Sequence, residues 1–236
     1  MPDFEAFDLE AMAHEQGRFN ARPAPAPVGG PPPSGLEPLG LESERDGVLY
    51  VPAGYTPEQP APLLLMLHGA TGNGRRTVET LLPLADEFGL ILLAPDSRLR
   101  TWDVLTGGYG PDIAFIDHAL AETFARFTID PERIAAEGFS DGASYALSIG
   151  IANGDLFTHV LAFSPGFIAP PGQVGMPRIF VSHGRQDAVL PIDHCSRRFV
   201  PQLRRAGYDV TYREFDGPHR TPPEIARMGV EWFAGG

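Results

Sequence analysis

The stretch 134–142 reads I-A-A-E-G-F-S-D-G, and it decides the fold of this chain of 236 residues. An apolar run enters it and a helix-like pattern follows. Its last five residues, Gly138 to Gly142, fit G-x-S-x-G, the pattern of a sharp strand-to-helix turn that presents a serine above a sheet. The two glycines suit such a turn because neighbouring backbone leaves no room for a Cβ atom. The pattern alone is common by chance, so the surroundings of Ser140 must support it.

Composition limits the classes of protein to consider. Hydrophobic residues make up 43% of the chain, enough for a substantial core. No run of eighteen apolar residues predicts a membrane span. Acidic residues interrupt the apolar ones near the N-terminus, so we read no secretory signal and expect a cytoplasmic protein, with secretion left open if a leader has been removed.

Charge and cysteine content narrow the chemistry. The net charge of −12 disfavours nucleic acids and anionic membranes as partners. All eighteen basic residues are Arg, which excludes lysine Schiff bases and Ser-Lys dyads. Cys195 is the single cysteine, so no internal disulfide forms. It follows His194, but no second Cys/His cluster accompanies this pair, and we expect no metal site.

The chain is expected to divide at residue 38. Residues 1–38 combine an acidic segment, for which a short helix packed on the domain is one form, with a Pro-rich linker from residue 21. Residues 39–236 form the main domain. Its strands are expected at 47–51, 62–68, 90–94, 133–137, 159–164, 178–183 and 208–215. Its helices are expected at 77–88, 112–127, 142–152, 191–206 and 222–233. This alternation predicts an α/β fold, with a mostly parallel sheet and helices on both faces.

Polar residues follow four of these strands, where ligands bind in such sheets. Ser140, Asp187 and His219 follow three of them, in the chain order of α/β-hydrolase triads. A serine hydroxyl needs an imidazole to take its proton, and the imidazole needs a carboxylate to orient it. We assign these roles to His219 and Asp187, with Asp216 as the competing carboxylate.

Two backbone N–H groups are expected to bind the oxyanion, those of Asp141 and of Ala70 in the loop after strand 62–68. His68 and His183 each precede a glycine at a strand end, and we interpret both as structural residues that bond neighbouring loops.

The sequence resembles serine esterases of the α/β-hydrolase superfamily, in the branch of carboxylesterases/phospholipases, dienelactone-hydrolase-like and polyhydroxyalkanoate-depolymerase-like proteins. The matching stretches are L-L-L-M-L-H-G-A (63–70), D-P-E-R-I-A-A-E-G-F-S-D-G-A (130–143), S-H-G-R-Q-D-A-V-L-P (182–191) and H-R-T-P-P-E (219–224). The resemblance covers about residues 45–234. It implies an acyl-enzyme mechanism on carboxylic esters, with no cofactor and no metal.

Substrate-pocket residues are less well defined by the sequence. Aromatic side chains in loops near the same sheet edge either line a pocket or pack beneath the loops. The candidates are Thr71, Trp102, Tyr109, Phe167, Val189 and Leu190. No large insertion follows residue 99 or residue 163, so we expect no large lid and an open cleft for short-chain, aryl or polymeric esters.

Three functions remain open at this stage. The first is a serine carboxylic-ester hydrolase acting on small-molecule or polymeric esters. The second is an acyl thioesterase or lysophospholipase, because the same triad serves both. The third is a non-catalytic binding protein with a hydrolase fold. The sequence also leaves the oligomeric state open, and a homodimer is one allowed state.

Overall fold

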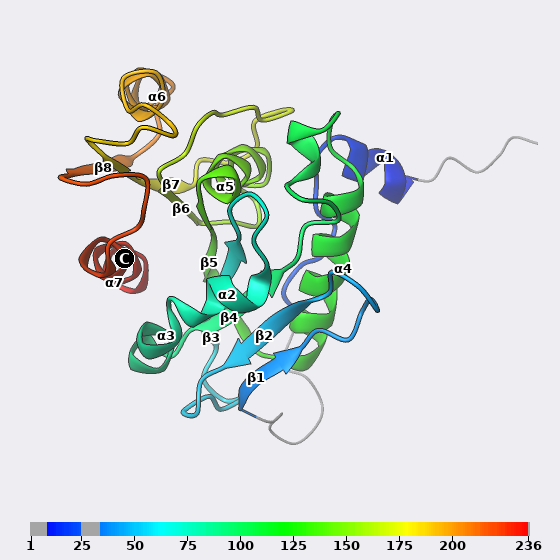
Figure 1. Ribbon diagram of the computed structural model, residues 1–236. Coiled ribbons are helices and arrows are strands. Elements are labelled where there is room, and N and C mark those ends of the chain that lie inside the picture. Colours follow the sequence, from blue (N-terminus) through cyan, green and yellow to red (C-terminus); the bar gives the residue numbers. More distant parts are fainter. Residues whose placement is uncertain (1–8, 25–33, 236) are drawn as a thin grey trace, which may run out of the picture.

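An eight-stranded sheet forms the centre of the fold (Figure 1). The structure is a computed structural model, which describes residues 9–24 and 34–235. The strand order is β1-β2-β4-β3-β5-β6-β7-β8. The strands are β1 (Gly35–Pro38), β2 (Gly47–Val51), β3 (Ala61–Leu67), β4 (Ile91–Pro95), β5 (Ile129–Phe139), β6 (His159–Phe163), β7 (Arg178–Gly184) and β8 (Val210–Phe215).

The sheet is mostly parallel, as expected. The pairs from β4 through β3, β5, β6 and β7 to β8 are parallel, while β1 and β2 add an antiparallel edge. All seven residues of β3 are buried, which matches its continuous apolar sequence, because a central parallel strand is covered on both faces. The carboxyl ends of β3, β5, β6, β7 and β8 therefore meet at one edge.

Helices cover both faces of the sheet. They are α1 (Leu9–Glu15), α2 (Gly74–Glu79), α3 (Leu82–Phe88), α4 (Pro111–Arg126), α5 (Asp141–Ala152), α6 (Ser196–Arg205) and α7 (Pro223–Ala234). Apolar side chains of α4, α5 and α6 form one core with one face of the sheet. Those of α2, α3 and α7 form a second core on the other face. The sheet with these two helical layers confirms the predicted fold class.

The helices differ in detail from the sequence prediction. The expected helix 77–88 is two helices, α2 and α3, separated at Thr80 and Leu81. Asn73 caps the first, because its side chain accepts the N–H of Arg76. The glycine expected at the end of the second is confirmed: Gly89 ends it with φ 65°. Between β4 and α4 the described chain inserts one short 3-10 helix, Asp103–Leu105.

The predicted linker is wrong at its end. Residues 35–38 form β1, which pairs with β2. The strand was not predicted because residues 35–38 directly follow a Pro-rich stretch and include Pro38. An edge strand nevertheless tolerates proline at a position where no ladder hydrogen bond is needed. The remainder of that stretch, residues 25–33, lies outside the described residues. The division of the chain into a segment and a domain stays a prediction.

The segment before this stretch packs on the domain. Helix α1 contacts α4, in agreement with a short packed helix. Phe19 is 2% exposed and meets Phe157 edge to face, with ring centroids 5.8 Å apart. The amide of Asn153 accepts the N–H of Phe19 and donates to the carbonyl of Gly17. Phe19 therefore belongs to the same core as α5.

The elbow glycines give the first testable prediction. A Cβ atom on Gly142 would overlap the carbonyl oxygen of Leu67, and one on Gly138 would overlap the backbone of Gly142. Since backbone cannot rotate away as a side chain can, Gly142→Ala should lower the free energy of unfolding by at least about 3 kcal/mol. Urea unfolding measures this. The control is Gly54→Ala, where the added atom meets nothing within 4 Å; equal stability of the two variants would contradict the packing argument.

Candidate functional site

Ser140 occupies the turn between β5 and α5. Its φ of 57° and ψ of −117° place a non-glycine residue in a costly region of backbone space. Its N–H donates to the carbonyl of Phe163 on β6 at 3.0 Å, and its carbonyl accepts the N–H of Ser144. These bonds and the close glycines hold the strained turn, so the hydroxyl projects at the edge where the strands end.

The structure brings His219 and Asp187 to this hydroxyl. The Nε2 atom of His219 lies 2.9 Å from the Oγ of Ser140, and its Nδ1 lies 2.6 Å from the Oδ2 of Asp187. Residue 219 follows β8 and residue 187 follows β7, so the topology places the three side chains in a row. The competing carboxylate, Asp216, points elsewhere: it is exposed and pairs with Arg185 at 2.9 Å.

The carboxylate of Asp187 is held from several sides. Its Oδ1 accepts the N–H groups of Val189 and Leu190, at 2.9 and 2.8 Å. Burial alone would raise the pKa of this carboxyl, but the Leu190 N–H and the imidazole of His219 outweigh burial and bring the pKa below its usual value. Val189 is 66% exposed. Both residues thus position the acid through their backbone, a contact the sequence did not predict.

The two other histidines near the site bond loops, as predicted. His183 lies 2.7 Å from the Oγ of Ser196 through Nδ1, and its Nε2 donates to the carbonyl of Leu190. His68 accepts the N–H of Ser97 at Nε2 and contacts the Gly69 carbonyl at Nδ1. Burial lowers the pKa of both, so each remains a neutral support for the loops.

The N–H of Ala70, in the described loop after β3, donates to no backbone carbonyl. The N–H of Thr71 donates to the carbonyl of Arg100, and that of Gly72 donates to Gly69. Ala70 lies between Gly69 and Thr71 and is exposed. The N–H of Asp141 is the first of α5 and has no intrahelical acceptor; its side chain instead accepts the hydroxyl of Thr101. These two N–H groups, which flank Ser140 in the fold, are the expected oxyanion donors.

The expectation that Trp102 lines a substrate pocket is wrong. Its side chain is 0% exposed. The ring stacks on Tyr145 with centroids 5.0 Å apart, contacts His68 and donates from Nε1 to the His68 carbonyl. Packing beneath the loop, the alternative for these aromatic residues, is what the structure shows here. Tyr109 behaves similarly: it stacks on Tyr145 and donates its hydroxyl to the Ala169 carbonyl.

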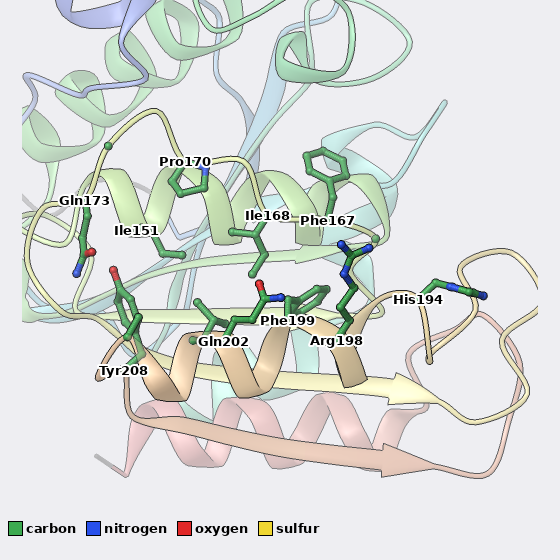
Figure 2. Close-up of a pocket in the computed structure, with 14 residues that line it drawn as sticks. Ile151, Phe167, Ile168, Pro170, Gln173, His194, Arg198, Phe199, Gln202 and Tyr208 are labelled. Carbon is green, nitrogen blue, oxygen red and sulfur yellow. The ribbon is translucent and has the colours of Figure 1, made fainter.

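Phe167 lines a pocket, but this pocket does not include the residues of the serine site (Figure 2). This pocket of about 490 Å³ lies between α5, α6 and the loop after β6, and Arg198 and Tyr208 also line it. Ser140, Asp187 and His219 do not line it. It is therefore separate from the hydroxyl that the site presents.

A larger pocket of about 650 Å³ borders the site on the other face of the sheet. Ala70 and His219 line it, together with Phe139 and Phe163. Glu137, near the carboxyl end of β5, also lines it. We call it the Glu137 pocket. The candidate pocket residues predicted from the sequence do not line this pocket, although a carboxylate within the apolar run 134–138 is a signal for it.

No cation pairs with Glu137 among the residues that the structure describes. Glu137 is 5% exposed, and its strand neighbours on β3 and β6 are Met66 and Leu161. Its Oε2 atom is buried without a hydrogen-bond partner. Burial raises its pKa to about 8, because the low-dielectric surroundings disfavour the charged form. Near neutral pH the side chain is therefore largely a neutral carboxylic acid.

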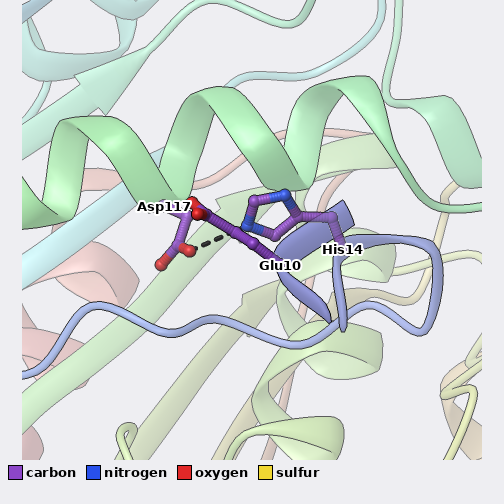
Figure 3. Close-up of side chains that lie close together, drawn as sticks. All are labelled: Glu10, His14 and Asp117. Atoms are coloured by element: carbon purple, nitrogen blue, oxygen red, sulfur yellow. Dashed lines mark hydrogen bonds and ion pairs between the residues drawn. The ribbon is translucent and has the colours of Figure 1, made fainter. Parts of the chain in front are cut away.

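One cluster in the described ranges has the spacing of metal ligands: Glu10, His14 and Asp117 (Figure 3). The carboxylate of Asp117, however, accepts the N–H groups of Asn20 and Ala21 and lies 2.8 Å from His14 Nε2. These donors use its oxygen lone pairs. The cluster thus fastens the N-terminal segment to α4.

None of the helices in residues 9–24 and 34–235 has the length and hydropathy of a membrane span.

Comparison with solved structures establishes the α/β-hydrolase fold. FphF, a fluorophosphonate-binding serine hydrolase of Staphylococcus aureus, superposes with a TM-score of 0.68 at 14% identity, covering 86% of this chain and 99% of that chain. Acyl-protein thioesterase 2 of Zea mays superposes with a TM-score of 0.56 at 18% identity, covering 79% and 96%. At sequence identities this low, the similarity shows the fold alone.

In sequence, the chain is similar to esterases. Feruloyl esterase C of Emericella nidulans is 29% identical over 160 residues, which cover 63% of this chain and 57% of that protein. The matched region thus spans little more than half of that relative. No protein-family model matches the sequence.

The raised pKa of Glu137 predicts a pH-dependent stability. Between its ordinary pKa of 4.5 and about 8, the unfolded chain ionises this group while the folded chain keeps it protonated. Its contribution to stability is thus complete below pH 4.5 and is lost as the pH rises to about 8. Each pKa unit is worth about 1.4 kcal/mol. Across this pH window, the free energy of unfolding of wild type should therefore decrease by a few kcal/mol relative to that of Glu137→Gln.

Urea unfolding of wild type and Glu137→Gln from pH 4 to pH 9 measures the difference between their free energies of unfolding. The contributions of the other titrating groups cancel in this difference. Glu132→Gln is the matched control, because Glu132 lies on the same strand but is exposed. Parallel curves for wild type and Glu137→Gln would show that Glu137 is ionised in the folded protein.

Proposed function

We propose that this protein is a serine hydrolase of carboxylic esters that works through an acyl-enzyme. The observation that carries the proposal is the row Ser140–His219–Asp187, with contacts of 2.9 and 2.6 Å, at a strained strand-to-helix turn. The similarity to proteins named feruloyl esterases supports the same reaction class.

In the first half of the reaction, the Nε2 of His219 takes the proton of the Ser140 hydroxyl as Oγ bonds to the ester carbonyl carbon. The carbonyl π electrons move to its oxygen, and the N–H groups of Ala70 and Asp141 stabilise that oxyanion. Asp187 holds the ring and stabilises its positive charge. When the oxyanion collapses, the bond to the alcohol breaks and the alcohol leaves with the proton of His219.

The second half repeats the sequence with water. His219 takes a proton from water as the water oxygen attacks the acyl carbon of the Ser140 ester. Collapse of the second oxyanion breaks the bond to Oγ, which recovers its proton from His219. The carboxylic acid leaves and the enzyme returns to its starting state.

The proposed substrates are short-chain, aryl or polymeric esters. In the described chain, the loop between β4 and α4 contains one 3-10 helix, 103–105, and the loop between β6 and β7 contains no helix. Apolar side chains on loops near the site are open to solvent: Leu99 is 59% and Val189 is 66% exposed. An uncovered apolar surface suits esters that approach from outside. Thioesters remain the second candidate substrates, and the net charge of −12 speaks against polyanionic ones.

Fluorophosphonate labelling tests the nucleophile. Wild type should be labelled and should hydrolyse p-nitrophenyl acetate and butyrate, while Ser140→Ala should lose labelling and lose about 10⁴-fold or more in kcat. Ser43→Ala is the control, since Ser43 is exposed and distant in sequence from the elbow. An unlabelled wild type would favour a non-catalytic binding protein, and activity confined to long-chain triglyceride emulsions would rule out the short-chain preference.

Two aspartates allow a matched test of the acid. Asp187→Asn should lower kcat by about 10⁴-fold, because the amide stabilises the wrong tautomer of His219. Asp216→Asn removes the same charge from an exposed position and should change kcat less than about three-fold. Steady-state kinetics on one ester measures both, with melting temperatures to verify folding. Equal losses in the two variants would overturn the assignment of Asp187.

A further inference from the structure

The pocket in Figure 2, which we call the α6 pocket, lies outside the serine site. Its volume of about 490 Å³ is within the range of pockets that hold small molecules. Arg198 and Gln202 lie one helical turn apart on α6 and both line it. His194 lies at the same end as Arg198, in the turn before the helix. The pocket thus has a polar border along one side of α6.

The walls of the α6 pocket are largely apolar. Phe199 and Leu203, which follow the polar border along α6, are 7% and 6% exposed. Ile151 of α5 and Ile168 of the loop after β6 line the opposite side (Figure 2). A hydrocarbon chain placed between these walls is removed from water, which favours binding.

Charge favours an anion in this pocket. The chain has 30 acidic residues, yet none of the described residues that line the pocket is Asp or Glu. Arg198 is exposed and forms no ion pair within the described part of the chain, whereas its neighbour Arg197 pairs with Asp193 and Glu214. The guanidinium of Arg198 is therefore available to hold a carboxylate through two parallel hydrogen bonds.

The far end of the pocket contains an unpaired hydroxyl. Tyr208 lines the end opposite Arg198 (Figure 2) and is 6% exposed. Its Oη is buried and has no hydrogen-bond partner among residues 9–24 and 34–235. Such groups are rare in native structures, because leaving them unpaired lowers stability. A ligand that accepts a hydrogen bond at this end supplies the partner.

Simpler ligands match these features less well. The positive charge of Arg198 disfavours a cation. A compact anion such as phosphate would contact Arg198 but not the apolar walls or Tyr208. Because an α-helix advances about 1.5 Å per residue, Arg198 and the end of α6 at Arg205 are about 10 Å apart. A ligand that reaches both ends therefore needs a chain of several carbon atoms.

We propose that the α6 pocket binds an elongated carboxylate anion. The carboxylate pairs with Arg198, and the hydrocarbon chain lies between Ile168 and Phe199. An uncharged acceptor near the other end of the ligand, such as a carbonyl oxygen, takes the hydrogen bond of Tyr208. No member of the serine row lines the pocket, so this binding is additional to the proposed ester hydrolysis and does not require it.

Calorimetry with octanoate and 7-oxooctanoate tests the proposal. Both probes carry a carboxylate and a hydrocarbon chain, and the second adds a carbonyl oxygen near the far end. Wild type should bind both, with 7-oxooctanoate several-fold tighter because it pairs with the hydroxyl of Tyr208. Octylammonium, which carries the opposite charge on the same chain, should not bind. If neither acid binds to wild type, or if octylammonium binds as tightly as octanoate, the proposal is overturned.

Three arginine variants locate the binding site. Arg198→Gln should raise the Kd of both acids roughly ten-fold, since it removes a charged hydrogen-bonding partner. Arg205→Gln removes the same charge from an exposed position of α6 that does not line the pocket, and should leave Kd unchanged. Arg220→Gln, next to His219 in the Glu137 pocket, should also leave Kd unchanged.

Two outcomes of this series would contradict the assignment. Equal losses in Arg198→Gln and Arg205→Gln would show a non-specific attraction to the helix. A loss confined to Arg220→Gln would place the acid beside the serine.

Tyr208→Phe tests the second contact. It keeps the ring and removes only the unpaired hydroxyl, so the protein should remain folded, which its melting temperature verifies. The variant should bind octanoate as wild type does and should bind 7-oxooctanoate no more tightly. A preference for 7-oxooctanoate that persists in Tyr208→Phe would overturn the role of Tyr208. Because calorimetry needs no turnover, these results do not depend on whether the protein hydrolyses esters.

Discussion

The fold depends on a close approach of backbone at the elbow. The end of β3, the end of β5 and the start of α5 meet where Gly138 and Gly142 leave no room for a side chain. This contact fixes how α5 leaves the sheet, and it forces Ser140 to a φ of 57°. Because parallel strands end at the same edge, the same geometry brings the loops after β7 and β8 to the serine. The candidate site is thus a consequence of how one helix is packed against one strand.

Buried polar side chains then fix the loops around that edge. His68 and His183 bond the loops after β3 and β7. Asp103 accepts the N–H groups of Gly110 and Asp112 and the hydroxyl of Tyr145, which ties the loop after β4 to α5. Since these groups satisfy one another, the loops carry little freedom near Ser140. Glu137 differs from these groups, because its Oε2 atom is buried and has no hydrogen-bond partner among residues 9–24 and 34–235.

The sequence could predict those features that follow from strand order. Ser140, Asp187 and His219 each follow a strand, so the topology of the sheet is enough to bring them together. The alternation of apolar runs with helical patterns predicted that topology. Features that depend on side-chain packing could not be predicted in this way. An aromatic residue in a loop fits equally well above or below it, and Trp102 proved to lie below, between His68 and Tyr145. Likewise, composition could not show that a Pro-rich stretch ends in an edge strand at residues 35–38.

Helix α5 is unusual in being enclosed on every side: each residue from Gly142 to Ala152 is buried. Such a helix cannot fray or tilt without opening the core around it, so its amide protons should exchange with solvent only when the whole domain unfolds. Asp141, the first residue of this helix, and Ser140 before it are anchored to that enclosed segment. On heating, the geometry of the elbow should therefore persist up to global melting, and residual activity would report the folded fraction of the protein rather than the state of a local segment.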